Sequence, residues 1–191
     1  CTAVPFYDDE PIRRHNQGIP IEVVSAGKDL VLGQLRNVAM DAAAHGSPDE
    51  ALLCTVDDDD CYGTRYFEGI GDAWCRHPFA LVIGLGSWDT QTVDRPPHTP
   101  LHQSGRPRGG PLSGVAGATL SIPAKIWRER TDLRYPAIAV GEDIELLAAA
   151  RRENRVVGAY FGDFVALRYS DPRHDHSSPN QGLLPVTGRR L

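Results

Sequence analysis

The chain has 191 residues, the length of one domain with a full hydrophobic core, and its hydrophobic content of 41% is ordinary for a globular protein. Its net charge of -5, without a run of basic residues, argues against a general nucleic-acid-binding protein. No apolar stretch approaches the roughly 20 residues of a membrane-spanning helix, so we expect no transmembrane segment.

The cysteines lack CxxC spacing and are too few for a disulfide scaffold, which favours a reduced, cytoplasmic protein. Cys54 lies within an apolar run and is expected to be a small core residue. The chain begins with Cys1 rather than Met, which we interpret as the result of trimming. A lipidation site or an N-terminal nucleophile at Cys1 are the alternatives.

The first part of the chain predicts a strand, a helix and a further strand. Short strands are expected at Thr2–Phe6 and Ile19–Ser25, and Asp29 is the expected N-cap of a helix that runs to about His45. The apolar residues that recur at helical spacing, and so predict its buried stripe, are Leu32, Leu35, Val38, Ala39 and Ala42. Ala51–Val56 is apolar without polar alternation, which is typical of a strand buried on both faces.

Downstream, a helix is expected at Gly63–Trp74 and a buried strand at Phe79–Leu85, with which Ser87–Val93 is expected to pair. Arg95–Gly114 is rich in Pro, Gly, Arg and His and has no periodicity, which indicates an active-site loop or disorder. The later elements are expected to be a strand at Val115–Ile122, a short helix from Pro123 through Trp127, a helix after Gly141, and strands at Val156–Phe161 and Phe164–Tyr169.

Four consecutive aspartates, Asp57–Asp60, follow the apolar run directly. The strand would place them at the carboxyl edge of a sheet, where open α/β sheets bind ligands. Adjacent carboxylates repel one another, and in a cleft they cannot all stay ionised without a cation. Because all-oxygen ligands suit Mg²⁺ or Mn²⁺, the run predicts a strand-end metal site. A solvated acidic turn is the competing interpretation.

Further motifs surround the aspartates in a definite order. They are Arg36-Asn37 in the preceding helix, Gly117–Ser121 before a helix with Trp127, the acidic pair Glu142-Asp143, and His174 and His176 near the end. Together, from about Thr2 to His176, these motifs resemble a GT-A glycosyltransferase of the family-2-like type. Each motif is common alone, and their order carries the resemblance.

The resemblance implies an α/β fold: a single GT-A-like (Rossmann-like) domain over residues 1–191, with a mostly parallel central sheet flanked by helices. Residues 1–95 would form the nucleotide-sugar-binding half and residues 111–191 the acceptor and catalytic half, with a flexible loop at 95–114. The implied activity is metal-dependent transfer of a sugar, with inversion, from a nucleotide-sugar donor to a hydroxyl of a glycan, peptide or small-molecule acceptor.

The resemblance also implies roles for individual residues. The residues implied to hold Mn²⁺ or Mg²⁺ are Asp59, Asp60, His174 and His176. The residues implied to contact the nucleotide-sugar are Asp57, Asp58, Arg36, Asn37 and Asp8. The acidic run leaves the register of the Asp-x-Asp motif open: Asp57 with Asp59 is the preferred pair, and Asp58 with Asp60 is the alternative. For Arg36, a surface salt bridge is the alternative role.

Asp143 is the expected general base, because an inverting transfer needs a carboxylate to take the acceptor's proton. Glu142 would orient the acceptor or support the base. Simple capping of the helix is the structural alternative for both residues. Trp88, Asp89 and Trp127 are expected to line the acceptor side, although buried tryptophans more often belong to a core.

Three other functions stay open at the level of sequence. A sugar-phosphate nucleotidyltransferase shares a similar sheet and metal chemistry, but it normally has a Gly-rich signature after the first strand, where this chain has the acidic stretch Tyr7–Glu10. A non-catalytic nucleotide- or carbohydrate-binding domain of the same fold is the second alternative. An N-terminal cysteine hydrolase acting through Cys1 is the third.

Overall fold

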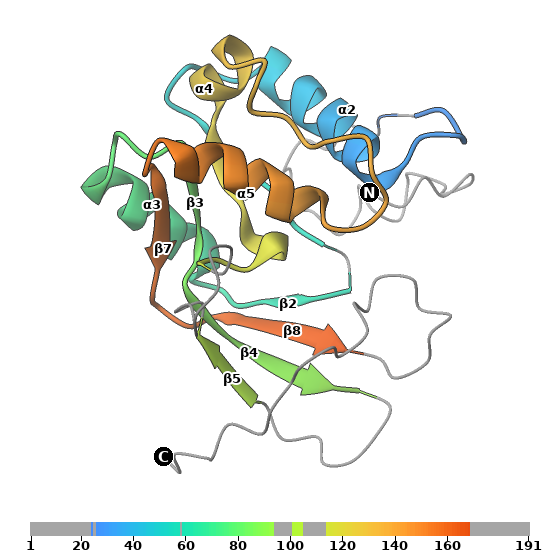
Figure 1. Ribbon diagram of the computed structural model, residues 1–191. Helices are drawn as coiled ribbons and strands as arrows, with labels where there is room; N and C mark the ends of the chain where they lie inside the picture. Colours follow the sequence, from blue (N-terminus) through green and yellow to red (C-terminus); the bar gives the residue numbers. More distant parts are fainter. Residues whose placement is uncertain (1–23, 25, 58, 94–100, 105–113, 169–191) are drawn as a thin grey trace, which may run out of the picture. The chain divides into compact units, whose positions relative to one another are not determined.

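The computed structural model describes residues 24, 26–57, 59–93, 101–104 and 114–168, and its elements keep the labels of Figure 1. The helices in these ranges are α2 (Leu32–His45), α3 (Tyr66–Arg76), α4 (Ala124–Glu129) and α5 (Glu142–Arg152), with a 3-10 turn η1 (Gly117–Thr119). The strands are β1 (Leu52–Cys54), β2 (Cys61–Tyr62), β3 (Val82–Leu85), β4 (Ser87–Thr92), β5 (Leu101–Ser104), β6 (Ser121–Pro123), β7 (Val156–Ala159) and β8 (Phe164–Arg168). The fold is therefore mixed α/β, as the sequence predicted.

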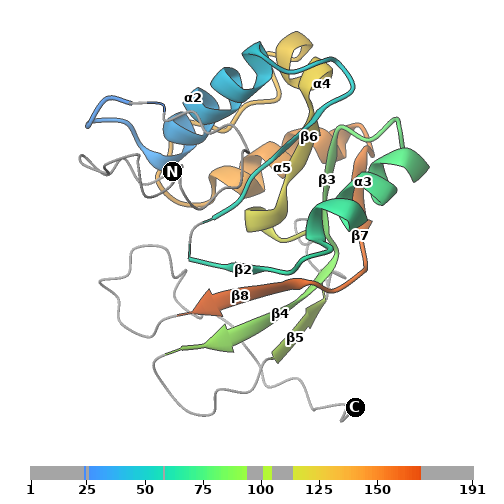
Figure 2. The same cartoon turned by 180° about the vertical axis from the view of Figure 1, so that it is seen from behind.

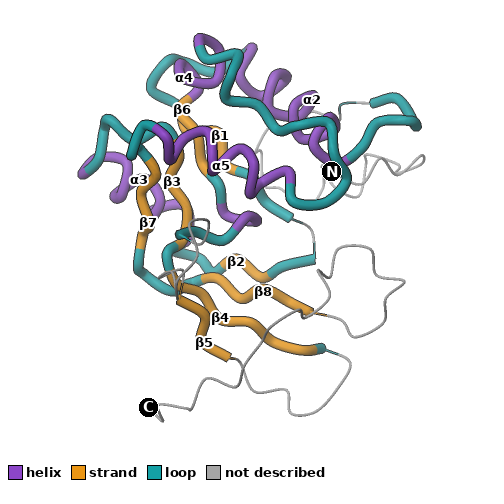
Figure 3. Tube along the Cα trace, in the orientation of Figure 1, coloured by secondary structure: helices purple, strands orange, loops and turns teal. Residues whose placement is uncertain are grey.

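The strands form two small sheets of mixed direction rather than one mostly parallel sheet. One sheet has the order β1-β6-β3-β7, in which β3 runs parallel to β7 and antiparallel to β6 (Figure 3). The other has the order β2-β8-β4-β5, in which β4 runs parallel to β8 and antiparallel to β5 (Figure 2). Each sheet thus combines a parallel crossover with antiparallel neighbours.

The chain forms two compact units, and each is assembled from separated segments. In the described part of the chain, the first unit comprises residues 24–53 and 123–149, and the second comprises residues 54–122 and 150–168. The boundaries between the units fall inside β1, β6 and α5.

The first unit contains α2 and α4, which lie side by side in Figures 1 and 2. The buried residues of α2 are Gly33, Met40 and Ala44, so the expected stripe of leucines, valine and alanines is only half-buried. Trp127 of α4 is fully buried, and its indole N–H donates to Asp41 Oδ1 at 2.7 Å. The guanidinium of Arg134 lies 4.1 Å from the Trp127 ring. Trp127 is therefore a core residue and cannot line an acceptor site, contrary to our expectation.

Helix α2 ends at His45 as predicted, but it begins at Leu32 and not near Asp29. The side chain of Gln34 accepts a hydrogen bond from the Val31 N–H at 3.1 Å. This contact satisfies the N–H of the N-cap residue itself, as the N3 side chain of a capping box does. The predicted Asp29 cap was wrong because Asp29 lies in a turn closed by the Leu30 N–H on the Gly27 carbonyl, so that Val31 is the N-cap residue.

In the second unit, α3 buries Tyr66, Ile70 and Ala73, a spacing of four and three residues that places them on one face. This helix contacts β3, whose four residues are all buried, and β7. The helix predicted at Gly63–Trp74 is thereby confirmed, but it begins at Tyr66. Its start is set by Asp163, which accepts the N–H of Gly63 at its carbonyl and the N–H of Arg65 at its carboxylate.

Other predicted strands differ in extent or pairing. Phe79, placed inside a buried strand by sequence, is 80% exposed, because β3 begins only at Val82. Ser87–Thr92 is a strand, but it pairs with β5 and β8 and not with β3. The predicted strand Val115–Ile122 is instead the turn η1 followed by β6.

The segment 95–114, predicted to be irregular, contains the strand β5. The predicted strand Thr2–Phe6, nearly all of Ile19–Ser25, and the polar tail after Arg168 lie outside the described residues. Among the helices that are described, none has the length and apolar character needed to traverse a lipid bilayer.

Candidate metal centre

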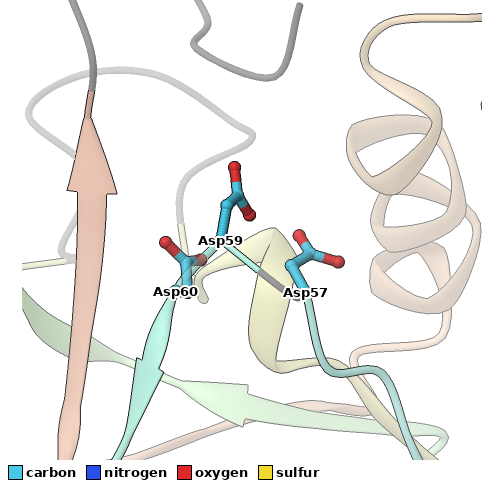
Figure 4. Close-up of side chains that lie close together, drawn as sticks. All are labelled: Asp57, Asp59 and Asp60. Carbon is cyan, nitrogen blue, oxygen red and sulfur yellow. The ribbon is translucent and has the colours of Figure 1, made fainter. Parts of the chain in front are cut away.

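Three carboxylates lie close together on the turn between β1 and β2, as Figure 4 shows. Asp57, Asp59 and Asp60 each present an oxygen atom, and these oxygens all lie within 4.8 Å of one another. All three side chains are half-buried. In an extended chain Asp57 and Asp59 would share one side and Asp60 would face the other, so the turn at residues 59–60 contributes to bringing all three together.

The strand that precedes the cluster is less buried than predicted. In β1 only Leu53 is buried, with its two neighbours half-buried, and Val56 is 46% exposed. The prediction of a strand buried on both faces was therefore wrong. Among the described residues, β1 lies at the end of its sheet order, next to β6.

The backbone of the turn is fastened by the hydroxyl of Tyr62. The Tyr62 Oη accepts the N–H of Asp57 at 2.9 Å and donates to the carbonyl of Ala118 at 2.8 Å. Just upstream, the Thr55 N–H donates to the carbonyl of Leu120 at 2.8 Å. The chain leading to the cluster is thus attached to residues 118–120, the segment that contains the Gly117–Ser121 motif.

Two side chains support Tyr62 and the segment it binds. The ring of Tyr66 packs edge-on against Tyr62, with ring centroids 4.9 Å apart, and its hydroxyl donates to the carbonyl of Thr119 at 3.3 Å. Burial raises the pKa of Tyr66 well above its usual range, so the hydroxyl remains protonated even in strongly basic solution. The hydroxyl of Thr119 accepts the N–H of Leu85 and donates to the carbonyl of Ala116. The cluster therefore rests on a connected, buried polar network.

Asp60 has its own anchor on the neighbouring strand. Its Oδ1 accepts the backbone N–H of Leu167, in β8, at 2.8 Å. The following residue, Cys61, pairs with Val165 of the same strand. A carboxylate that is oriented by a backbone amide has fewer rotamers to lose when it binds a ligand.

The donor set fits a hard divalent cation. Three carboxylate oxygens match the ligand preference of Mg²⁺, Mn²⁺ and Ca²⁺. Ligand oxygens of an octahedral Mg²⁺ lie about 3.0 Å apart when adjacent and about 4.2 Å apart when opposite, so the three carboxylates would draw closer together on binding the ion.

A second group of predicted site residues meets in the first unit. Arg36 Nε lies 3.1 Å from Glu142 Oε1, and the two side chains are only 10% and 5% exposed. Asn37 exchanges two hydrogen bonds with the backbone of Tyr135. Asp143 follows Glu142 in the first turn of α5 and is half-buried. The alternative role of Arg36, a surface salt bridge, was wrong about the setting, because both side chains of the pair are almost fully buried. Its expected contact with the nucleotide stays a prediction.

The remaining predicted residues are placed only in part. Asp8, Asp58, His174 and His176 lie outside the described residues, so the choice between the two Asp-x-Asp registers stays a prediction. The aspartates of the cluster belong to the second unit, whereas Arg36, Asn37, Glu142 and Asp143 belong to the first. Trp88 and Asp89 are half-buried residues of β4, in the second unit.

Sequence reasoning gave no role to the residues that hold the two groups. Tyr62 was an obvious neighbour of the aspartates, but its partner Ala118 is 56 residues away. Tyr135 and Leu167 offer only backbone groups, which carry no side-chain signal. Gly33, whose N–H donates to the carbonyl of Ile138, did carry a usable signal in the sequence. A glycine inside a helix costs stability and so indicates close packing.

No family model matches the sequence, and no curated protein is significantly similar to it.

Proposed function

We propose that the protein is a metal-dependent glycosyltransferase of the GT-A type, which moves a sugar from a nucleotide-sugar to an acceptor hydroxyl with inversion. The observation that carries the proposal is the proximity of Asp57, Asp59 and Asp60 on one turn, with oxygens within 4.8 Å of one another. A solvated acidic turn, with the carboxylates spread apart in water, was the competing interpretation of the same four aspartates.

Asp59 and Asp60 are the proposed protein ligands of Mn²⁺ or Mg²⁺, with His174 and His176 as further candidates beyond the described residues. The bound cation would neutralise the charge that develops on the departing nucleoside diphosphate. Asp57 would help to hold the cation or accept a hydrogen bond from the ribose. Tyr62 holds the backbone from which the Asp57 side chain projects.

Asp143 is the proposed general base. The acceptor oxygen would form a bond to the anomeric carbon while the bond from that carbon to the diphosphate oxygen breaks, and the acceptor's proton would pass to the Asp143 carboxylate. Asp143 stands in the first turn of α5, where the helix dipole favours negative charge. Its half-buried side chain stays accessible to an acceptor.

Thermal unfolding with a panel of nucleoside diphosphates, each with and without Mn²⁺, tests the proposal. One diphosphate should raise the melting temperature only when Mn²⁺ is present. Hydrolysis of the matching nucleotide-sugar should then be detectable, which separates an enzyme from a non-catalytic binding domain. A protein that responds to no diphosphate in the presence of Mn²⁺ is not a glycosyltransferase of this type.

A further inference from the structure

One face of α2 is attached to the segment that leads into Asp143. Gly33, Arg36 and Asn37 are spaced at i, i+3 and i+4, so they lie on the same side of the helix. Each contacts a residue between 135 and 142. All of these residues belong to the first unit, so the contacts are internal to one compact body.

The contact at Gly33 is backbone against backbone. Its N–H donates to the carbonyl of Ile138 at 3.1 Å. A Cβ atom on Gly33 would lie 1.9 Å from the carbonyl oxygen of Pro136 and 3.2 Å from the Cβ of Glu142. Only glycine allows this approach, so the start of α2 and the start of α5 are locked at close range.

Asn37 makes the second attachment through a reciprocal pair of hydrogen bonds. Its Nδ2 donates to the carbonyl of Tyr135 at 2.8 Å, and its Oδ1 accepts the Tyr135 N–H at 3.0 Å. The Asn37 amide thus donates to and accepts from the backbone of one residue, as the backbone of a paired β-strand does. Both polar atoms of the Asn37 amide are thereby engaged, so this side chain is a structural connector.

Arg36 makes the third attachment, through a buried charge. It pairs with Glu142 at 3.1 Å, and its guanidinium carbon lies 5.6 Å from the centre of the Tyr135 ring. A buried ion pair often adds no more stability than apolar residues of the same volume. The pair does fix the direction of the Glu142 side chain, which points from the first turn of α5 to α2.

We propose that Arg36 is a positioning residue, which fixes the first turn of α5 through Glu142 and thereby sets the orientation of Asp143. The inference rests on the proposed role of Asp143 as the base. Successive residues of a helix are about 100° apart, so engaging Glu142 with α2 directs Asp143 to a different side. In this assignment Arg36 acts on Glu142 and not on the nucleotide, and Glu142 supports the base without touching the acceptor.

Two measurements on the 191-residue chain test the assignment. In Arg36→Met, hydrogen–deuterium exchange of the amides of residues 145–149 should be at least about tenfold faster than in the wild type. Arg36→Lys retains the charge but not the planar fork, and its exchange should be intermediate. In hydrolysis assays with UDP-, GDP- and dTDP-sugars, Arg36→Met should lower kcat about 100-fold. The Kd of the stabilising nucleoside diphosphate should stay within about twofold.

The matched control is Arg134→Met, which removes another half-buried arginine that stacks on an aromatic ring in the same unit. It should lower thermal stability while leaving exchange at residues 145–149 and kcat unchanged. Unchanged exchange in Arg36→Met would overturn the assignment, with or without an enzymatic assay. A Kd that weakens in step with activity would overturn it as well, by making Arg36 a nucleotide contact. Absence of any turnover by the wild type would instead refute the proposed function.

Discussion

Removing one charge from the aspartate cluster should make the metal-free protein more stable than the wild type. In the presence of metal, the same variant should be less stable than the wild type. The informative change is Asp59→Asn, which keeps the shape of the side chain and removes its charge. Asp59 lies between Asp57 and Asp60, and the presented oxygens of the three are within 4.8 Å of one another. Two like-charge interactions are therefore relieved by the one substitution.

The size of the effect follows from that distance. Two unit charges 4.8 Å apart repel by about 1 kcal/mol in bulk water and by about 3.5 kcal/mol at an effective dielectric constant of about 20. Because the side chains are half-buried and salt screens them, we expect a net gain of about 1 kcal/mol in the free energy of unfolding. For a chain of this length, that gain raises the melting temperature by about 2–4 °C.

Mn²⁺ should reverse the order of the two melting temperatures, so that the wild type becomes more stable than Asp59→Asn. A ligand at a hundredfold excess over its Kd stabilises the folded state by about 2.7 kcal/mol, or a shift of roughly 5–10 °C. The wild type should show this shift and Asp59→Asn should lose most of it. Differential scanning fluorimetry in low-salt buffer, with and without Mn²⁺, measures both effects on the same samples.

Asp72→Asn is the matched control, because Asp72 is an exposed carboxylate in α3 and the change in net charge is identical. It should leave the Mn²⁺ response unchanged. Our reasoning is refuted if Asp59→Asn lowers the melting temperature without metal, since the cluster would then support the fold. Equal stabilisation of Asp59→Asn and the wild type by Mn²⁺ would refute it too.

Three other substitutions give distinct expected outcomes. Asp143→Asn should keep Mn²⁺ and nucleotide binding but lose about 10²–10⁴-fold in donor turnover, and unchanged turnover in a steady-state assay would remove Asp143 as the base. Tyr62→Phe deletes the hydroxyl that fixes Asp57 and should weaken Mn²⁺ binding about 10- to 100-fold by titration calorimetry, whereas Tyr160→Phe, at a 63% exposed ring, should not. Gly33→Ala should lower the free energy of unfolding in urea by about 1–3 kcal/mol, because the added Cβ meets a carbonyl oxygen. Gly71→Ala, which has open space around it in α3, should raise the same quantity by up to about 1 kcal/mol. Equal effects of the two alanines would show that helix propensity alone decides.

Sequence patterns located the helices better than the sheets. The end of α2 at His45 and the start of α5 at Glu142 were predictable, because a glycine adjoins each helix end and α5 opens with acidic residues. The start of α2 was not, because the Gln34 side chain bonds back to Val31. Strand pairing was not predictable either. Ser87–Thr92 is strand-like on any local criterion, but its partners β5 and β8 are selected by tertiary packing.

The candidate site shows the same division. That Asp57, Asp59 and Asp60 could gather was predictable, since they are neighbours in the chain. Their restraint by Tyr62 and by the Leu167 amide was not, because hydrogen bonds across 56 and 107 residues leave no local pattern. For Arg36, the sequence showed a charge that interrupts an apolar stripe and gave no means of finding its partner.

The reciprocal bonds between Asn37 and Tyr135 also constrain how the chain is made, because 98 residues separate the two partners. A ribosome that adds about 5–20 residues per second needs about 5–20 s to deliver Tyr135 after Asn37 has emerged. During translation, α2 therefore exists for seconds without the segment that satisfies its amide and its arginine. The nascent α2 segment therefore has to stay free of aggregation until residues 135–142 have been synthesised.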